Sequence, residues 1–489
     1  MSTISCEDQI AQFQQFRQDV YANFPLNRDS LMDLLDAMTG NITAQTPVEL
    51  CEHPCFRRGY SALYKAIRQF FVPSSPNAAA AERKQFQKSL LKALSPLIKA
   101  PTTRNFYLFG LDTTPIPRPF SPTIPDRTYI HQPNTIKGNK PINIGHQYSL
   151  LSFLPSAEGT KNIPWSIPLS TQRVRSNTNS IAVGVEQIDT TLHHCPAFEQ
   201  EQLSVLVADS YYSQRQFLDA LSKESNLVLI TRVRSNRVFY RQPSSSEETN
   251  SGRGHRRWYG ERFDLKDEIT WHQPDEITQT NFTTRRGRPL QLNISAWHQM
   301  LMRGTREYPM HQHPFTLLQV RVTDEFGQQL WHPMWLIVMG TRRNELTIMD
   351  CYLSYRQRFD MEHTLRFSKQ RLLMNSFQTP DVEHEENWVQ LTQLAYIQLW
   401  AARNLVEVLP RPWEKSYHKK TLHSVTPSLV QRDFYRIIRL IGTPAVSPKP
   451  RGFSSGRVPG DSKEKRKRHP VLKKTKKMKK NSSPTQTAA

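Results

Sequence analysis

The chain has 489 residues and a mass of 56.9 kDa, and its 37% of hydrophobic residues include 23 Phe, 16 Tyr and 9 Trp. This length and this supply of large apolar side chains exclude wholesale disorder and leave room for two to four domains. The net charge of +22, from 65 Lys and Arg against 43 Asp and Glu, favours a polyanionic partner, with nucleic acid first and an acidic membrane surface second.

No stretch approaches the 18 apolar residues of a membrane span, so we expect no membrane partner. The amino terminus has no basic start followed by an apolar run, so we expect no secretion signal. Five cysteines are too few for a disulfide scaffold and suit a reducing compartment. We therefore expect a cytoplasmic protein.

The first 100 residues are expected to be helical. Apolar residues recur at spacings of three and four over 9–22 and 30–38, and two further helices are predicted over 56–71 and 81–99. The third predicted helix interleaves basic and aromatic residues, which favours a DNA-binding domain. A helical cap packed on the next domain is the alternative interpretation.

From residue 105 the pattern changes to apolar strands and amphipathic helices. Strands are predicted first, and then helices and strands alternate, which indicates an α/β layer with a mixed sheet. The predicted strands cover 105–111, 146–154, 165–174, 204–208 and 227–233, and the helices cover 180–192 and 213–222.

Residues 234–345 interrupt this pattern. They are rich in Arg, Ser, Gly, His and Trp, with strand-like runs at 290–297, 315–322 and 335–339, so we expect a β-rich insertion. A long basic helix is predicted over 352–373, followed by an apolar helix over 388–408.

About half of the positive charge lies near the carboxyl end. Residues 449–480 hold 14 Lys and Arg and two acidic residues, a net of +12 out of +22. Gly, Ser and Pro surround these basic blocks and apolar periodicity is missing, so we expect residues 446–489 to form a disordered basic arm. Such an arm would bind DNA phosphates without reading sequence; a solubilising tail or an import signal is the alternative.

Two aspartates follow apolar strands. Asp112 comes after Tyr-Leu-Phe-Gly-Leu, and Asp209 comes after Val-Leu-Val-Ala. Ligands bind at the strand ends of α/β sheets, and a carboxylate pair with a third acid can hold two divalent metals for phosphodiester chemistry. Either aspartate alone also fits a helix cap.

The long basic helix supplies a third acid. Tyr355, Arg358, Glu362 and Lys369 are spaced by three, four and seven residues, which places them within an arc of roughly 60° on one helix face. That face combines a metal ligand with two cations suited to DNA phosphates and a phenol that can donate to a phosphate. A solvated polar face would show the same spacing.

The pattern Y-x2-R-x3-E-x6-K, formed by Tyr355, Arg358, Glu362 and Lys369, resembles the signature of the DDE transposases of bacterial insertion sequences, insertion-sequence family four and its relatives. Asp112 and Asp209, 97 residues apart, and Glu362, a further 153 residues along, match the acidic residues of that family. The resemblance covers roughly residues 105–403.

The resemblance implies a fold and a domain order. The fold class is α/β, with a ribonuclease-H-like catalytic core interrupted by a β-rich insertion. The expected domains are 1–100 (helical, DNA-binding), 105–233 (first part of the core), 234–345 (β-rich insertion), 346–410 (last part of the core with the catalytic helix), 411–445 (helical region) and 446–489 (disordered basic tail).

The resemblance also implies cut-and-paste transposition by a two-metal mechanism. Asp112, Asp209 and Glu362 would bind two Mg²⁺ ions, for which Mn²⁺ can substitute, while Tyr355, Arg358 and Lys369 would contact DNA phosphates. Relatives form a hairpin on the transposon end and stack a flipped base on a Trp of the insertion; Trp331, Trp297 and Trp258 are the candidates here, although each also fits a core position.

The partners implied are the transposon ends and the target DNA, bound by a homodimer in a synaptic complex near the nucleoid. Two other interpretations stay open. One is a transposase-derived protein that binds DNA but has lost catalysis, and the other is a nuclease that cleaves DNA without joining ends. The intact acidic residues favour the transposase.

Overall fold

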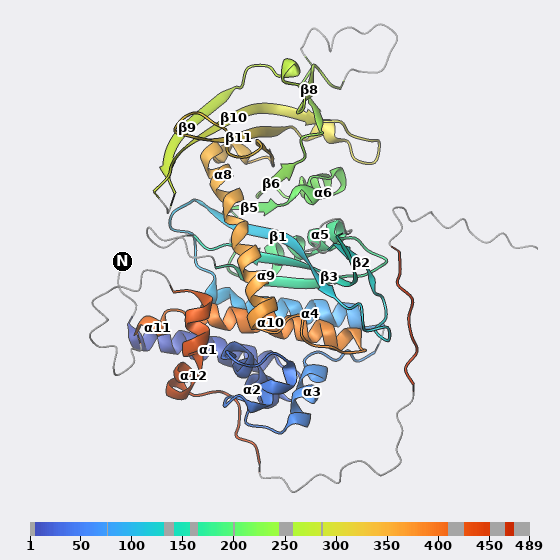
Figure 1. Ribbon diagram of the computed structural model, residues 1–489, viewed down its shortest axis with the longest axis vertical. Helices are drawn as coiled ribbons and strands as arrows, with labels where there is room; N and C mark the ends of the chain where they lie inside the picture. Colours follow the sequence, from blue (N-terminus) through green and yellow to red (C-terminus); the bar gives the residue numbers. More distant parts are fainter. Residues whose placement is uncertain are drawn as a thin grey trace, which may run out of the picture.

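The computed structural model describes residues 5–75, 77–131, 141–156, 165–198, 201–243, 258–284, 287–408, 425–449 and 465–473. Figure 1 shows a sheet above a layer of helices, with helices α8 (Ile348–Gln357) and α9 (Phe359–Arg371) crossing from the sheet towards that layer. No helix in the described part of the chain combines the length and the apolar character needed to cross a membrane.

The helices predicted before residue 100 are present. The first is closed at its start by a capping box, because the Ser5 hydroxyl accepts from the N–H of Asp8 and the Asp8 carboxylate accepts from the N–H of Ser5. The bounds of these helices are α1 Cys6–Asn23, α2 Arg28–Thr39, α3 Tyr60–Gln69 and α4 Ala79–Leu94.

These helices pack on the carboxyl-terminal helices α10 (Val382–Ala402) and α12 (Pro427–Ile441). The buried Arg17 guanidinium lies 2.5 Å from the Asp36 carboxylate, which also accepts a hydrogen bond of 3.0 Å from the Gln398 side chain of α10. A buried ion pair needs such further hydrogen bonds to offset its desolvation. The arrangement agrees with a helical cap on the core, and the predicted DNA-binding role stays a prediction.

The central sheet is mixed, as predicted. Antiparallel strands β4, β3 and β1 stand side by side, and β5 and β6 follow β1 in parallel. The short strand β2 (Thr128–His131) adds an edge along β3 that the sequence did not indicate. The bounds are β1 Phe106–Pro117, β3 Ile142–Phe153, β4 Ile167–Val174, β5 Leu203–Ala208 and β6 Leu227–Val233, with helices α5 Ser180–His194 and α6 Arg215–Leu221 between strands.

The β-rich insertion continues this sheet. Strand β12 (Met334–Met339) pairs antiparallel with β6, and the order then runs β11, β10, β7 and β8, with β9 on β10. The remaining bounds are β7 Val238–Tyr240, β8 Arg262–Asp264, β9 Glu276–Thr283, β10 Pro289–Met302 and β11 Phe315–Asp324. The insertion is therefore joined to the core by main-chain hydrogen bonds.

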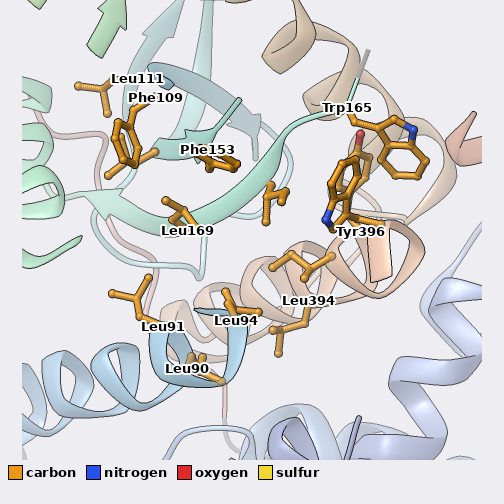
Figure 2. Close-up of a cluster of buried hydrophobic side chains, with 14 of the residues drawn as sticks. Leu90, Leu91, Leu94, Phe109, Leu111, Phe153, Trp165, Leu169, Leu394 and Tyr396 are labelled. Carbon is orange, nitrogen blue, oxygen red and sulfur yellow. The ribbon is translucent and has the colours of Figure 1, made fainter. Parts of the chain in front are cut away.

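Both faces of the central sheet are buried, as is usual where parallel strands are covered by helices. Phe106 and Leu108 of β1 face a cluster that includes α8 and α9, whereas Phe109 and Leu111 face the larger cluster with α4, α5 and α10. Figure 2 shows this larger cluster: leucines of α4, aromatic and leucine side chains of the sheet, and Leu394 and Tyr396 of α10 converge.

The predicted helix 352–373 is broken at Arg358. The Arg358 N–H donates to the carbonyl of Tyr355, three residues back, so the regular ladder tightens between α8 and α9. The apolar helix predicted over 388–408 begins earlier, as α10, and ends with a short helix α11 (Leu405–Val408).

Part of the predicted disordered tail is ordered, which corrects that prediction. The His469 N–H donates to the Pro122 carbonyl and the Leu472 N–H donates to the Arg127 carbonyl, both at 2.9 Å. Leu472 also forms a parallel bridge with Thr128 of β2. The open edge of β2 therefore holds this segment, seen as the red extended stretch in Figure 1. Residues 450–464 and 474–489 of the predicted tail lie outside the described residues.

Candidate active site

Strand pairing brings Asp112 and Asp209 together. Leu111 of β1 is the parallel partner of Ala208 of β5, so the two aspartates occupy the next register position on neighbouring strands. Asp112 lies inside β1, and Asp209 follows the last residue of β5. The sequence placed both at strand ends; β1 in fact continues to Pro117.

Helix α9 reaches this sheet edge because β1 has a glycine where the helix crosses it. A Cβ atom on Gly110 would stand 2.2 Å from the sulfur of Met361, so only glycine lets this methionine approach without displacement. The neighbouring residue of α9 is Glu362. The close packing of Met361 on β1 therefore brings the third acid beside Asp112.

Arg358 bridges two of the three carboxylates. Its Nη1 lies 3.0 Å from Oδ2 of Asp112 and its Nη2 lies 2.9 Å from Oε1 of Glu362. The guanidinium is largely buried, and its Cζ lies over the Tyr355 ring, 5.8 Å from the ring centre. A contact between Arg358 and a DNA phosphate would thus compete with its ion pairs to the carboxylates.

The electrostatics of the site centre on Asp112. Burial raises the pKa of its carboxyl to about 6; the Arg358 charge opposes this rise, and the negative charges of Asp209 and Glu362 add to it. Its Oδ1 accepts a hydrogen bond of 2.8 Å from the Thr113 N–H. The accumulated negative charge makes this sheet edge favourable for a cation.

Asp209 also serves as a cap, the alternative that its sequence position allowed. Its Oδ1 accepts a hydrogen bond of 3.0 Å from the Tyr211 N–H at the start of the short 3₁₀-helix Ser210–Tyr212. One carboxylate oxygen is engaged in this way. Capping and metal binding are compatible, since the cap fixes the carboxylate orientation.

The three carboxylates offer the hard oxygen donors that Mg²⁺ and Mn²⁺ prefer. Among the residues that the structure describes, the only group of three metal-binding side chains within 4.8 Å of one another is Asp189, His193 and Glu224, at the far end of the sheet. The predicted triad is therefore more widely spaced. Two metals about 4 Å apart accept ligands separated by up to roughly 8 Å, so a spacing wider than 4.8 Å is compatible with a two-metal site.

A family comparison agrees with this chemistry. The model of the DDE superfamily endonuclease family matches residues 19–304. The chain belongs to the DDE superfamily of endonucleases. No curated protein shows significant similarity to the chain.

Membership of the DDE superfamily implies DNA as the substrate and divalent metal ions as the cofactor class. The matched residues include Asp112 and Asp209 but end before Glu362. The assignment of Glu362 as the third acid thus depends on its position beside Asp112 and on the common Arg358 bridge.

The other two residues of the predicted Y-x2-R-x3-E-x6-K pattern differ in exposure. Tyr355 is buried in the cluster between the sheet and α8, where burial raises the pKa of its phenol. Lys369 lies two turns beyond Glu362, and burial lowers the pKa of its ammonium group to about 8, against an opposing effect of the Asp112 charge. Lys369 is only partly buried, so it is better placed than Tyr355 for a phosphate contact.

Two further residues, which the sequence did not single out, lie beside the candidate active site. Arg232 stands next to Asp209 in register, because Thr231 of β6 pairs with Ala208, and its side chain is exposed. Tyr212 is buried beside the aspartates, and burial, Asp112 and Asp209 raise the pKa of its phenol. Arg232 lies inside β6, shortly after the apolar run 227–230, a signal similar to the apolar run before Asp209.

The structure separates the three tryptophans proposed for base stacking. Trp297 is 3% exposed within an aromatic cluster of Phe263, Trp271 and Trp335, and its indole N–H donates to the His272 carbonyl. The other two are on the surface: Trp331 is 63% exposed, and Trp258 lies 4.2 Å from the His311 ring. A base could reach Trp331 and Trp258 without disrupting the core.

Proposed function

We propose that this DDE superfamily protein is a DNA transposase that cleaves and joins phosphodiester bonds at the ends of an insertion sequence. The observation that carries the proposal is the convergence of Asp112, Asp209 and Glu362, from three distant segments, at one edge of a mixed sheet. The strand order β4, β3, β1, β5 and β6, with β1, β5 and β6 parallel, supports a ribonuclease-H-like core.

Asp112, Asp209 and Glu362 would hold two Mg²⁺ ions, or Mn²⁺ in their place. The ions would supply Lewis-acid activation of an attacking water or 3′-hydroxyl and stabilise the departing oxygen. Arg358 keeps Asp112 and Glu362 compensated and would move to a phosphate as positive charge enters the site.

Three cations surround these acids and would position the DNA. Arg358 and Lys369 come from α9 and its junction with α8, and Arg232 comes from the end of β6. Phosphate contacts of this kind fix the register of DNA without reading its sequence. The Tyr355 ring packs against the Arg358 guanidinium and would help to hold it in position. A flipped base would stack on Trp331 or Trp258.

A cytoplasmic homodimer, bound to two transposon ends and then to target DNA near the nucleoid, completes the proposal. The competing function is a transposase-derived protein that binds DNA without cutting it. Such a protein has no need of metal ligands, so the intact acids and their close contacts with Arg358 favour the enzyme. A nuclease without joining activity would differ only in the last step.

The test is cleavage of a duplex that carries the ends of the native element, with Mg²⁺ or with EDTA. We expect metal-dependent cuts at the element boundary and joining to a second duplex. Glu362→Gln should bind the same DNA and lose both steps, whereas Glu7→Gln, at an exposed carboxylate of α1, should retain them. Binding without cleavage by the wild type, in Mg²⁺ and in Mn²⁺, would favour the binding-only protein; cuts without joining would favour the nuclease.

A further inference from the structure

The ordered part of the tail lies at a defined place on the molecule. Besides the two backbone hydrogen bonds to Pro122 and Arg127, Arg466 lies 3.0 Å from the carboxylate of Asp381, the residue that precedes α10. The segment 465–473 is therefore attached both to the edge strand β2 and to the start of α10. These contacts restrict the positions that its basic residues can take relative to the rest of the protein.

The start of α10 also contacts α3. The Asn387 side-chain amide donates to the Ile67 carbonyl at 3.0 Å and to the Phe71 carbonyl at 3.2 Å, at the end of α3. Asp381 and Asn387 are six residues apart, about 9 Å along a helix. The beginning of α10 therefore contacts both the tail segment and the end of α3.

His384 lies between these two contacts. Its Nδ1 is 3.2 Å from the Asp381 carboxylate. Burial lowers its pKa, and the charges of both Arg68, from α3, and Arg466, from the tail, lower it further, while Asp381 and Glu383 act against them. Cations from the two segments therefore act on the same imidazole.

The two segments expose uncompensated positive charge. Lys465, Lys467 and Arg468 of the tail and Lys65 and Arg68 of α3 are exposed, and no acidic side chain among the described residues forms an ion pair with them. We call these five residues the α3–tail surface. On a folded protein, five such charges in two adjacent segments favour a polyanionic partner.

Two exposed tyrosines lie on the same helix. Tyr60 and Tyr64 pack edge to face with ring centres 5.7 Å apart, and Tyr64 stacks on Phe377 at 6.3 Å. Their hydroxyl groups can donate to phosphate oxygens, as tyrosine commonly does in protein–DNA contacts. Cations interleaved with such donors suit a nucleic-acid backbone.

We propose that the α3–tail surface binds the phosphate backbone of duplex DNA at a place separate from the three carboxylates. Arg118 follows β1 and its Nε lies 2.7 Å from Glu385 of α10, so the start of α10 stands six residues of strand away from Asp112. At 3.4 Å per residue this is about 20 Å, or roughly six base pairs. A duplex that occupies the candidate active site and extends about six base pairs beyond it would therefore cover this distance. The inference rests on DNA being the substrate.

The test measures binding of a 30-base-pair duplex of random sequence in EDTA, where no cleavage contributes, over a range of salt concentrations. The tail variant carries Lys465→Gln, Lys467→Gln and Arg468→Gln; the α3 variant carries Lys65→Gln and Arg68→Gln. Each phosphate contact contributes about 0.9 to the slope of log affinity against log salt. We expect the slope to become shallower by about 3 for the tail variant and by about 2 for the α3 variant.

Two further variants separate the proposal from a general charge effect. Lys92→Gln, Lys99→Gln and Lys223→Gln together remove three exposed lysines near the end of α4 and before β6, and we expect the slope to be unchanged. Leu472→Pro keeps every charge but removes the N–H that donates to Arg127. We expect this variant to lose a measurable part of the affinity, because the charges are no longer held beside α3.

Several outcomes would overturn the proposal. They are wild-type slopes in the tail and α3 variants, an equal loss in the lysine control, or unchanged affinity in Leu472→Pro, which would indicate a free arm. A tail or α3 variant that loses binding to phosphatidylserine vesicles but binds DNA as the wild type does would identify an acidic membrane as the partner instead. Because no cleavage is measured, failure here leaves the proposed function untouched, and loss of cleavage in Glu362→Gln leaves this surface untouched.

Discussion

Lys369 provides a prediction in which stability and function oppose each other. Burial lowers the pKa of its ammonium group from 10.5 to about 8. At about 1.4 kcal/mol per pKa unit, keeping this lysine charged in the folded protein costs about 3 kcal/mol. Because the side chain retains some contact with water, we expect a smaller cost, about 1–3 kcal/mol. Lys369→Met keeps the apolar stem and removes the charge, so it should stabilise the protein by that amount at neutral pH.

The dependence on pH follows from linkage. Below pH 8 the lysine is charged in both the folded and the unfolded state, so the full cost is present. Between pH 8 and 10.5 the unfolded state holds the proton more tightly, and the wild type gains stability as the pH rises. The advantage of Lys369→Met should therefore be largest at pH 7 and smaller at pH 10.

The assay is chemical or thermal unfolding of the wild type and Lys369→Met at pH 7 and pH 10. Lys92→Met, at an exposed lysine of α4, is the matched control and should change stability by less than about 0.5 kcal/mol at either pH. If Lys369→Met destabilises the protein at pH 7, or if its gain is the same at both values, the reasoning is refuted. The same variant should weaken DNA cleavage, since a phosphate partner for Lys369 is lost.

Four other substitutions test the packing of the core and of the candidate site. Glu385→Gln leaves the fully buried Arg118 without its charge partner and should lower the unfolding free energy by about 3–5 kcal/mol, measured by thermal unfolding. Trp297→Ala should cost about 3–5 kcal/mol through a cavity in the aromatic cluster, whereas the exposed Trp331→Ala should stay within about 0.5 kcal/mol; equal effects would contradict the placement of the two rings. Gly110→Ala should displace Met361 and reduce metal-dependent cleavage more than it reduces DNA binding; unchanged cleavage would show that α9 tolerates the added methyl group.

The sequence was informative where local pattern and tertiary position coincide. Apolar runs that end in Asp112 and Asp209 predicted two strands and two acids, and the helical spacing predicted that Arg358 and Glu362 share a face. The ion pairs of Arg358 with Glu362 and Asp112 agree with that arrangement. The two strands are confirmed, because strand periodicity is set by nearby residues, whereas the roles of the acids stay predictions.

Other features depend on contacts between distant segments and left no local signal. The helical periodicity continues through Arg358, so the break there could not be read from spacing; its side chain is fixed by ion pairs on two different elements. The tail was expected to be disordered from its composition, but the N–H groups of His469 and Leu472 find acceptors beside the edge strand β2. Charge composition does not reveal an open sheet edge. Arg232 could have been found, since it comes shortly after the apolar run 227–230 of β6, much as Asp209 comes after the apolar strand β5.

The central claim is that Asp209 and its neighbouring acids bind the metal ions that support DNA cleavage. The most direct measurement is cleavage by Asp209→Cys with Mg²⁺ and with Mn²⁺, because a thiolate is a poor ligand for Mg²⁺ and a better one for softer metals. We expect activity close to background with Mg²⁺ and partial recovery with Mn²⁺, while DNA binding in EDTA stays at the wild-type level. Cleavage by Asp209→Cys at the wild-type rate in Mg²⁺ would contradict the central claim.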